Sequence, residues 1–392
     1  MPTTGRLEDD VRAMTLAEKE EIIRRFNARV DAAIADSSPS KQRIKQALSR
    51  GGAPRCPVRL RRLSLDVILR YGDALADLFC EYPDDAICVP GYDLFVGYQP
   101  AERPHRINTI EVLTQDAQWT DEWGTKWGHS TGGVGATTVF NPLADWSQLD
   151  DYLAHRMPDP LAPGRLDGAL PALRMHGRTR YFAGMSHMAI FERLHCLRGM
   201  QNTFADFHGN PDEVHRLLDV LTDYYVEIVR SWGRLGGVDG VFMTDDWGTQ
   251  TSLMISPAMW RNSFAARYRR ICDEAHRCDM HVIFHSCGNV TAIVGDLIDA
   301  GVDILDPIQP EAMDLAKVAS EFGGKVAFCG GISDQELARL SPEQVREHVR
   351  RTIDTLGSRF GNAYLVGSSN VLCPEVPLEN LRALFEACHN QA

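Results

Sequence analysis

The sequence predicts an α/β fold, a (β/α)8 TIM-type barrel with an N-terminal helical extension. From residue 180 onward, short apolar runs alternate with amphipathic helical patterns, which is typical of parallel βαβ units. No G-x-G-x-x-G motif follows the first strand, which argues against an open dinucleotide-binding sheet. Because the C-terminal half alone supplies most of the strands that a barrel needs, the whole chain fits a barrel as one domain.

The N-terminal region, residues 1–55, is predicted to be a helical extension outside the barrel, which then occupies residues 56–392. A helix is expected over 15–35, because Thr15 and Glu18 form a capping-box pattern and the apolar residues that follow keep a helical period. A partly disordered terminus is the alternative interpretation of this region.

The predicted strands are short apolar runs flanked by polar residues or glycine: Ala86–Val89, Tyr181–Met185, Gly240–Thr244, His281–Phe284, Asp303–Leu305, Lys325–Cys329 and Ala363–Gly367. The clearest helix is Asn289–Ala300, which Gly301 closes. Residues 119–165 are rich in Trp, Gly, Asp and Pro, and we expect them to form an extended segment that wraps the barrel mouth.

Composition limits the classes of partner. The formal net charge is −12 over 392 residues, which argues against a general affinity for nucleic acid or anionic membranes. No apolar run approaches the roughly 20 residues of a membrane helix, and the first residues lack the apolar core of a secretory signal. We therefore expect a cytoplasmic protein whose ten cysteines are thiols or metal ligands.

Active sites of such barrels lie at the C-terminal ends of the strands. Asp245 and Asp246 follow one strand, and because neighbouring residues of an extended segment point to opposite sides, at most one of them faces the barrel axis. We predict Asp246 as a catalytic residue, with Trp247 and Gln250 binding substrate. The alternative is a helix N-cap or an ion-pair partner.

The strongest local signal is His285-Ser-Cys287, directly after another strand. A His and a Cys two positions apart on an extended segment point the same way, and zinc prefers nitrogen and sulfur ligands. Cys373, Cys329 and Asp306 are candidates for a third ligand. Alternatively, His285 is a substrate-binding or structural residue and Cys287 packs as a small apolar group.

Three further residues follow predicted strands. Asp93 is predicted to be catalytic, and Tyr92 and His187 are predicted to bind substrate. The sequence has no G-x-S-x-G elbow, no Walker A loop and no H-E-x-x-H motif, so hydrolase and kinase interpretations have no support.

The sequence resembles the uroporphyrinogen decarboxylase-like superfamily, and most closely its branch of methylcobamide:coenzyme M and other corrinoid-dependent methyltransferases. The segments that carry the resemblance span roughly residues 85–385: Asp121-Glu-Trp-Gly-Thr-Lys-Trp127, Leu197-Arg-Gly199, Asp245-Asp-Trp-Gly-Thr-Gln250 with Ser256-Pro257, His285-Ser-Cys-Gly-Asn289, Gly301-Val-Asp303, Gly330-Gly331 and Pro377-Leu-Glu-Asn380.

Within the superfamily, two departures argue against porphyrinogen decarboxylation. The R-Q-A-G-R-Y-type segment that binds substrate carboxylates in true decarboxylases is absent, and the region reads Pro57-Val-Arg-Leu-Arg-Arg-Leu63. Gly367-Ser-Ser369 replaces their Gly-His-Gly. Asp93 resembles the family's pyrrole-binding aspartate but has no arginine partner.

The methyltransferase branch implies zinc held by His285, Cys287 and Cys373, which activates a thiol acceptor. In the family the later cysteine lies near the position of Asn370, so Cys373 requires a small shift of its loop, and Cys329 is the alternative. Some relatives transfer methyl groups to tetrahydrofolate and need no such zinc.

The resemblance thus implies a corrinoid-linked methyltransferase that acts on a small-molecule methyl donor or acceptor. It implies a separate corrinoid protein as partner and a homodimer as a candidate assembly. A decarboxylase of a tetrapyrrole or other small acid, and a non-enzymatic binding protein, are the alternatives.

Overall fold

A sheet of parallel strands forms the centre of the computed structural model, which describes residues 11, 13–49, 52–90, 98–99, 107–130 and 136–391. In spatial order the strands are β1 (Ala86–Pro90), β5 (Tyr181–Ser186), β6 (Gly240–Thr244), β7 (His281–His285), β8 (Ile304–Ile308), β9 (Ala327–Ile332) and β10 (Tyr364–Ser368). All six neighbouring pairs are parallel, and every strand overlaps one predicted from the sequence. The predicted TIM-type barrel is confirmed.

The segment 57–60 closes the sheet between β10 and β1. Val58 forms a parallel bridge with Val366 of β10. The backbone N–H of Arg59 donates to the Val366 carbonyl at 2.9 Å, and on the other side the N–H of Asp85 donates to the Val58 carbonyl at 2.9 Å. This segment therefore takes the position of an eighth strand.

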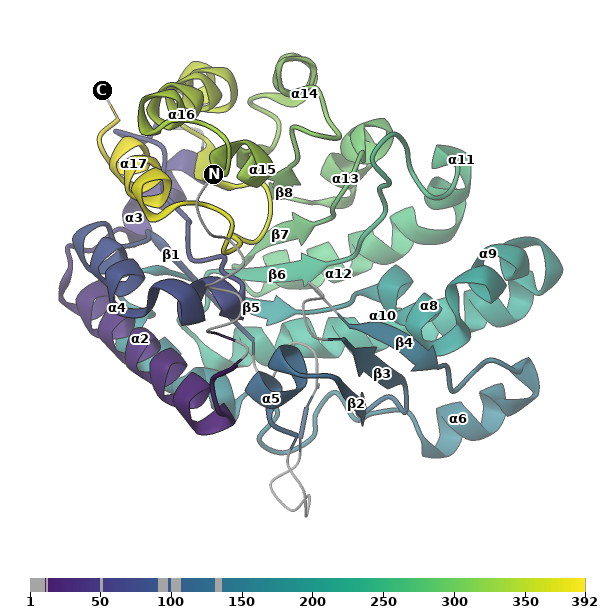
Figure 1. Cartoon of the computed structure of the whole chain (residues 1–392). Helices are drawn as coiled ribbons and strands as arrows, with labels where there is room; N and C mark the ends of the chain where they lie inside the picture. The colour runs from purple at the N-terminus through teal and green to yellow at the C-terminus, as the bar shows by residue number, and fades with distance from the viewer. Residues whose placement is uncertain are drawn as a thin grey trace.

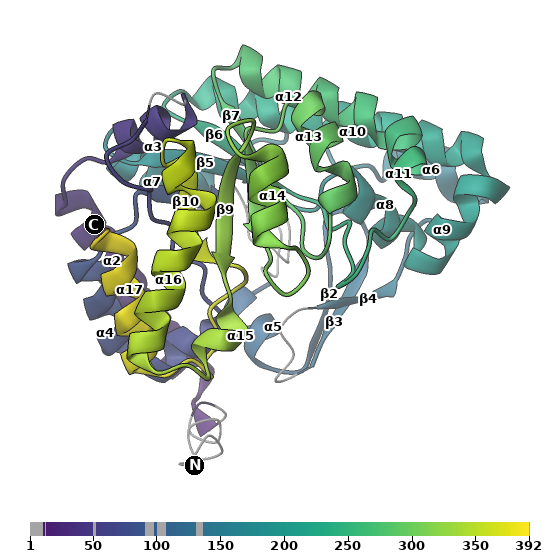
Figure 2. The same cartoon turned by 90° about the horizontal axis from the view of Figure 1, so that it is seen from above.

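Helices cover the outside of the sheet (Figures 1 and 2). They are α2 (Leu16–Asp36), α3 (Lys41–Leu48), α4 (Leu65–Glu81), α5 (Thr109–Thr114), α6 (Leu149–His155), α7 (Leu170–His176), α8 (Ile190–Arg198), α9 (Met200–Gly209), α10 (Pro211–Leu235), α11 (Pro257–Trp260), α12 (Ala266–Arg277), α13 (Val294–Ala300), α14 (Leu315–Phe322), α15 (Asp334–Leu337), α16 (Pro342–Leu356) and α17 (Leu378–His389). None of the described helices has the length and apolar character that crossing a bilayer requires.

Helices from the N-terminal and C-terminal parts of the described chain meet where the sheet closes. In Figure 1 the blue helix α4 lies between the purple helix α2 and the yellow helix α17. The ring of Phe79 on α4 packs edge-on against Phe385 on α17, with centroids 4.7 Å apart. The predicted capping box of α2 is confirmed, since Thr15 and Glu18 exchange hydrogen bonds.

The described helices of the N-terminal extension pack against the barrel and do not stand apart from it. Phe26 and Val30 of α2 belong to the main buried cluster, and Ile44 of α3 belongs to the cluster inside the barrel. Lys41 and Lys45 of α3 bind Asp239, just before β6, at 2.8 and 3.0 Å. Helix α3 thus covers the N-terminal end of the barrel, opposite the expected active-site end.

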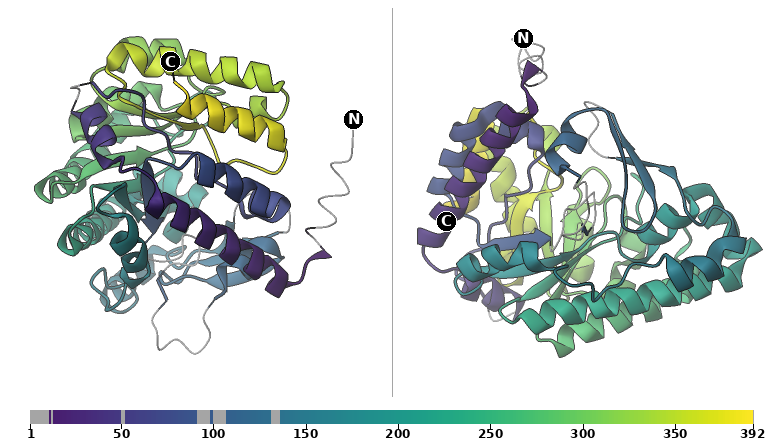
Figure 3. Two further views of the ribbon diagram at one scale, coloured as in Figure 1. Left: turned by 90° about the vertical axis from the view of Figure 1, so that its left-hand side faces the viewer. Right: turned by 90° about the horizontal axis from the view of Figure 1, so that it is seen from below.

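Residues 119–165 are more regular than the expected extended segment. Three antiparallel strands, β2 (Ala117–Thr120), β3 (Lys126–His129) and β4 (Thr137–Phe140), form a second sheet. Trp119 and Trp127 stack across it with centroids 6.5 Å apart. Figure 2 and the right-hand view of Figure 3 show this sheet on the side of the molecule away from α2 and α17. Strands of four residues are too short to show a clear period in the sequence.

We predict that Ile44→Ala destabilises the fold by about 2–5 kcal/mol, because it leaves a cavity at the covered end of the barrel. Gln42→Ala on the same helix, at an exposed position, is the control and is expected to cost about 0.5 kcal/mol or less. Urea-induced unfolding measures both. Equal effects of the two substitutions would contradict the role assigned to α3.

Candidate metal centre

The loops after β6 and β7 are held together by their backbones. Gly248 and Gly288 approach so closely that a Cβ on Gly288 would lie 2.4 Å from the Gly248 carbonyl oxygen, and Gly288 has a φ of +79°. The N–H of Gly248 donates to the Cys287 carbonyl at 3.2 Å, and the N–H of Asn289 donates to the Thr249 carbonyl at 2.7 Å. Only glycine fits both positions without displacing backbone.

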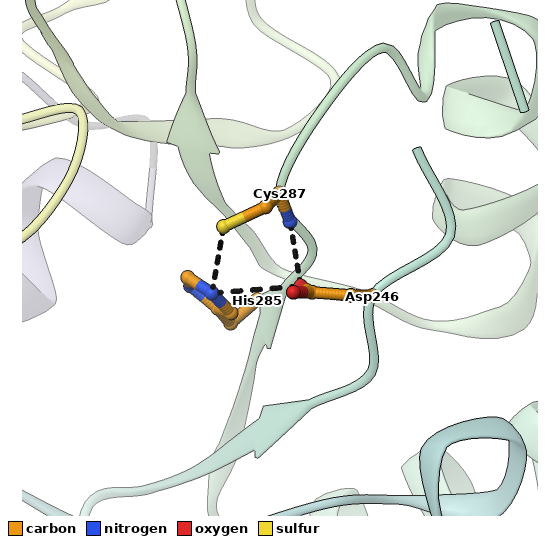
Figure 4. Close-up of side chains that lie close together, drawn as sticks. All are labelled: Asp246, His285 and Cys287. Carbon is orange, nitrogen blue, oxygen red and sulfur yellow. Dashed lines mark hydrogen bonds and ion pairs between the residues drawn. The ribbon is translucent and has the colours of Figure 1, made fainter. Parts of the chain in front are cut away.

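This contact brings Asp246 to His285 and Cys287 (Figure 4). The thiol Sγ of Cys287 lies 3.5 Å from Nε2 of His285, and a carboxylate oxygen of Asp246 lies 3.7 Å from the same nitrogen. The backbone N–H of Cys287 donates to Asp246 at 2.7 Å, which fixes that carboxylate. One possible ligand atom from each residue lies within 4.8 Å of the other two.

Strand geometry explains why His285 points inward. Ile283 belongs to the cluster inside the barrel, and alternate residues of a strand point to the same side. His285 pairs in register with Asp306 of β8, so both side chains face the interior. Nδ1 of His285 lies 2.7 Å from a carboxylate oxygen of Asp306. A carboxylate on one imidazole nitrogen leaves the other nitrogen as the ligand.

Two arginines of the closing segment and its continuation surround Asp306. Arg59 binds one carboxylate oxygen at 2.6 Å, and Arg62 binds the other at 3.2 Å. Asp306 is fully buried. Burial alone would raise its pKa, but the charges of Arg62 and Arg59 and the hydrogen bond with His285 outweigh burial and hold the pKa well below its usual range.

The Cys287 thiol stays protonated at neutral pH in the absence of a cation. Burial, followed by the charge of Asp246, raises its pKa to about 12. A thiolate ligand at this position therefore requires a nearby positive charge, such as a bound metal ion.

The two adjacent aspartates have separate environments, as strand geometry requires. Asp245 is buried and accepts hydrogen bonds from the backbone N–H groups of Phe191 and Glu192, at 2.9 and 2.6 Å, and from the hydroxyl of Tyr268. Asp245 thus holds the first turn of α8, whereas Asp246 faces the cluster. Burial raises the pKa of Asp245 to about 7.

Glu192 adds a third carboxyl group near the cluster. Burial first, and then the charges of Asp246 and Asp245, raise its pKa well above the usual value. Three carboxyl groups gathered around one point favour a bound cation. Glu192 lies in the first turn of α8 after β5, a position that the sequence analysis did not consider.

The predicted substrate-binding residues that the structure describes differ in their exposure to solvent. The prediction for Trp247 is wrong, because the ring is fully buried, stacks on Phe191 with centroids 4.0 Å apart and donates to the Tyr268 hydroxyl at 3.1 Å. Gln250 is exposed in the loop after β6, and His187 is half-buried just beyond β5. Tyr92 and Asp93 lie outside the described residues.

Neither predicted third cysteine ligand joins the cluster. The Cys373 thiol is half-buried and donates to the Val371 carbonyl at 3.2 Å. Cys329 is buried beside Arg59, whose guanidinium lies 3.5 Å from its sulfur. Asp246 takes the third position, and Asp306 contacts the far side of the His285 ring.

The cluster suits a tetrahedral zinc ion. It offers nitrogen, sulfur and oxygen donors, all of which zinc accepts. The 3.5 Å between Nε2 of His285 and the sulfur matches the roughly 3.5 Å expected for a nitrogen and a sulfur on one tetrahedral zinc ion, and the 3.7 Å between Nε2 and the Asp246 oxygen is slightly longer than the roughly 3.3–3.5 Å expected for a nitrogen and an oxygen. Three protein ligands leave a fourth position for a substrate atom, as in catalytic zinc sites.

The Arg59–Asp306–Arg62 network carries a stability prediction. Asp306→Ala leaves two largely buried guanidinium groups without their carboxylate, so we expect a loss of about 3–5 kcal/mol. Asp296→Ala, which breaks the more exposed pair with Arg261, is the matched control and should cost far less. Thermal unfolding of both variants checks this, and a loss at Asp306 no larger than at Asp296 would contradict it.

Comparisons with known proteins place the chain in a family. The family model described as uroporphyrinogen decarboxylase (URO-D) matches residues 148–391. A uroporphyrinogen decarboxylase of Methylibium petroleiphilum is 23% identical over 188 residues, which is 47% of this chain and about half (48%) of that relative. A methyltransferase from Methanosarcina mazei has a similar fold, with a TM-score of 0.65 at 18% identity over 90% of this chain and 99% of that one. The family match covers more than half of the sequence, and the chain therefore belongs to the uroporphyrinogen decarboxylase (URO-D) family.

Proposed function

We propose that this protein is a corrinoid-linked methyltransferase with zinc bound by His285, Cys287 and Asp246. It moves a methyl group between a methylcobamide, or a small methylated compound, and a thiol or tetrahydrofolate acceptor. The observation that carries the proposal is the convergence of one nitrogen, one sulfur and one oxygen donor within 4.8 Å at the C-terminal ends of β6 and β7.

The chemistry of the site fits transfer to a thiol. Zinc bound here would lower the pKa of an acceptor thiol and hold it as a thiolate. The corrinoid of a partner protein would supply the methyl group and would keep the electron pair of the broken methyl–cobalt bond, while His285, Cys287 and Asp246 would hold the zinc that keeps the attacking sulfur as a thiolate. Asp246, fixed by the N–H of Cys287, contributes the oxygen ligand of the site.

The carboxyl groups around the cluster support a cation at this position. Glu192 and Asp245 carry raised pKa values in the ion-free protein, with burial as the main cause and the charge of Asp246 as a further one. A divalent ion relieves this repulsion. The fold shared with the Methanosarcina mazei methyltransferase supports the methyl-transfer part of the proposal.

A decarboxylase of a tetrapyrrole or other small acid is the second candidate, favoured by the likeness to the Methylibium petroleiphilum decarboxylase. The contacts of Arg59 and Arg62 argue against it. Both guanidinium groups bind Asp306, so neither offers a free charge to substrate carboxylates.

Metal analysis tests the proposed site. We expect the purified wild-type protein to retain stoichiometric zinc and the Cys287→Ala and Asp246→Ala variants to lose most of it, because three protein ligands are the usual minimum of a catalytic site. Inductively coupled plasma mass spectrometry after dialysis measures the content. Cys80→Ala, which removes an exposed thiol on α4, is the control and should bind zinc like the wild type.

Cys373→Ala separates the two candidates for the third ligand. Retention of zinc in this variant, with loss in Asp246→Ala, supports the oxygen ligand. Loss of zinc in Cys373→Ala, with retention of zinc in Asp246→Ala, would identify Cys373 as the third ligand, as predicted from the sequence. A wild-type protein without zinc would contradict the metal site.

The reaction class requires a separate assay. We expect demethylation of methylcobalamin in the presence of a small thiol, followed by the change in its visible spectrum, and we expect Cys287→Ala to abolish it. Release of carbon dioxide from a candidate acid without added corrinoid would instead identify the decarboxylase. A separate corrinoid protein is the proposed partner in the cell.

A further inference from the structure

We propose that Arg62 is a positioning residue for the metal site, acting through the carboxylate of Asp306 on the ring of His285. The inference rests on the proposed function for its consequence, metal affinity, and on the structure alone for its mechanism. Arg62 lies in the segment after the closing strand, far from His285 in the sequence but in contact with it in the fold.

The Asp306 carboxylate is held at both oxygens. Arg59 contacts Oδ2 at 2.6 Å, while Arg62 and Nδ1 of His285 contact Oδ1 at 3.2 and 2.7 Å. The plane of the carboxylate is therefore fixed, and so is the direction in which it receives a hydrogen bond. Because the group is fully buried, water does not compete for these contacts.

This carboxylate selects one tautomer of His285. An unprotonated Nδ1 would place its lone pair 2.7 Å from an anionic oxygen, which is repulsive. The contact with Asp306 is also shorter than the 3.1 Å between Nδ1 and Nη2 of Arg62, so Nδ1 carries the hydrogen and donates to Asp306, and Arg62 makes no hydrogen bond to this nitrogen. Nε2 then presents its lone pair toward Cys287 and Asp246, at 3.5 and 3.7 Å. Ligand orientation of this kind tunes metal affinity.

Arg62, more than Arg59, has the geometry of a positioning group. Its Nη2 lies 3.1 Å from Nδ1 of His285 while its Nη1 binds Asp306, so it borders both partners. Arg59 instead lies deeper, with its guanidinium 4.7 Å from the Phe242 ring centroid and 3.5 Å from the Cys329 sulfur. Arg59 packs the barrel interior, and Arg62 confines the imidazole.

Arg62→Met tests the inference, because it keeps an unbranched side chain and removes the charge and the donors. We expect the affinity for Co²⁺, used as a spectroscopic substitute for zinc, to fall about 10–100-fold, with an altered visible spectrum of the bound ion. Arg62→Lys, which restores the charge, should recover part of the affinity. Arg61→Met is the matched control: the neighbouring arginine binds Asp31 and Asn27, away from the cluster, and we expect wild-type binding.

A second readout needs no metal. Nitrogen NMR of the His285 ring in the metal-free protein, at a pH where the ring is neutral, should show the Nδ1–H tautomer in the wild type and in Arg61→Met. We expect a mixture of tautomers in Arg62→Met, because the Asp306 carboxylate, then held only by Arg59, can turn away from Nδ1. If that variant does not fold, Arg62→Gln, which keeps a donor without the charge, takes its place.

The two readouts separate the inference from the proposed function. If the wild-type protein binds no Co²⁺ but Arg62→Met shows the change of tautomer, the metal site is disproved and the positioning role of Arg62 stands. A wild-type protein that binds Co²⁺, together with an Arg62→Met variant of unchanged affinity, spectrum and tautomer, would overturn the positioning role alone.

Discussion

The buried carboxylate of Asp306 is the constraint on which the barrel and its candidate site both depend. A buried carboxylate is stable only when its oxygens are paired, and the partners here come from three parts of the chain: Arg59 of the closing segment, Arg62 just after it and His285 of β7. The same contacts close the barrel and orient the imidazole. Loss of this one group should therefore affect the stability of the fold and the geometry of the donors together.

The donors converge because two loops are joined by their backbones. Gly248 and Gly288 allow the turns after β6 and β7 to touch, which places Asp246 against the N–H of Cys287. In the ion-free state the result is electrostatically unfavourable, with a protonated thiol and a set of carboxyl groups whose pKa values are raised. A divalent cation would resolve these conflicts, so the electrostatics and the donor geometry favour the same interpretation.

Much of this arrangement was predictable from local patterns, and the part that was not involves contacts between distant segments. The strands of the barrel and the His285-x-Cys287 pair follow from periodicity and from the preference for sites at strand ends. The alternation of Val58, Arg59, Leu60 and Arg61 was a weak strand signal. Its pairing with β10 joins two segments that are far apart in the sequence, and a local pattern does not predict such a contact. Trp247 was assigned to the pocket because it follows a strand, although such a residue can also turn into the core. The position of Asp246, and not Cys373, beside His285 and Cys287 depends on loop conformation, which spacing does not determine.

The central claim is a zinc site with one histidine, one cysteine and one aspartate ligand from the protein. X-ray absorption spectroscopy at the zinc edge of the purified protein, without substrate, tests it most directly, because sulfur and lighter ligands scatter differently and at different distances. We expect a single sulfur at about 2.3 Å from the zinc, with the remaining ligands nitrogen or oxygen at roughly 2.0–2.2 Å from it. Two sulfur ligands, or none, would contradict it.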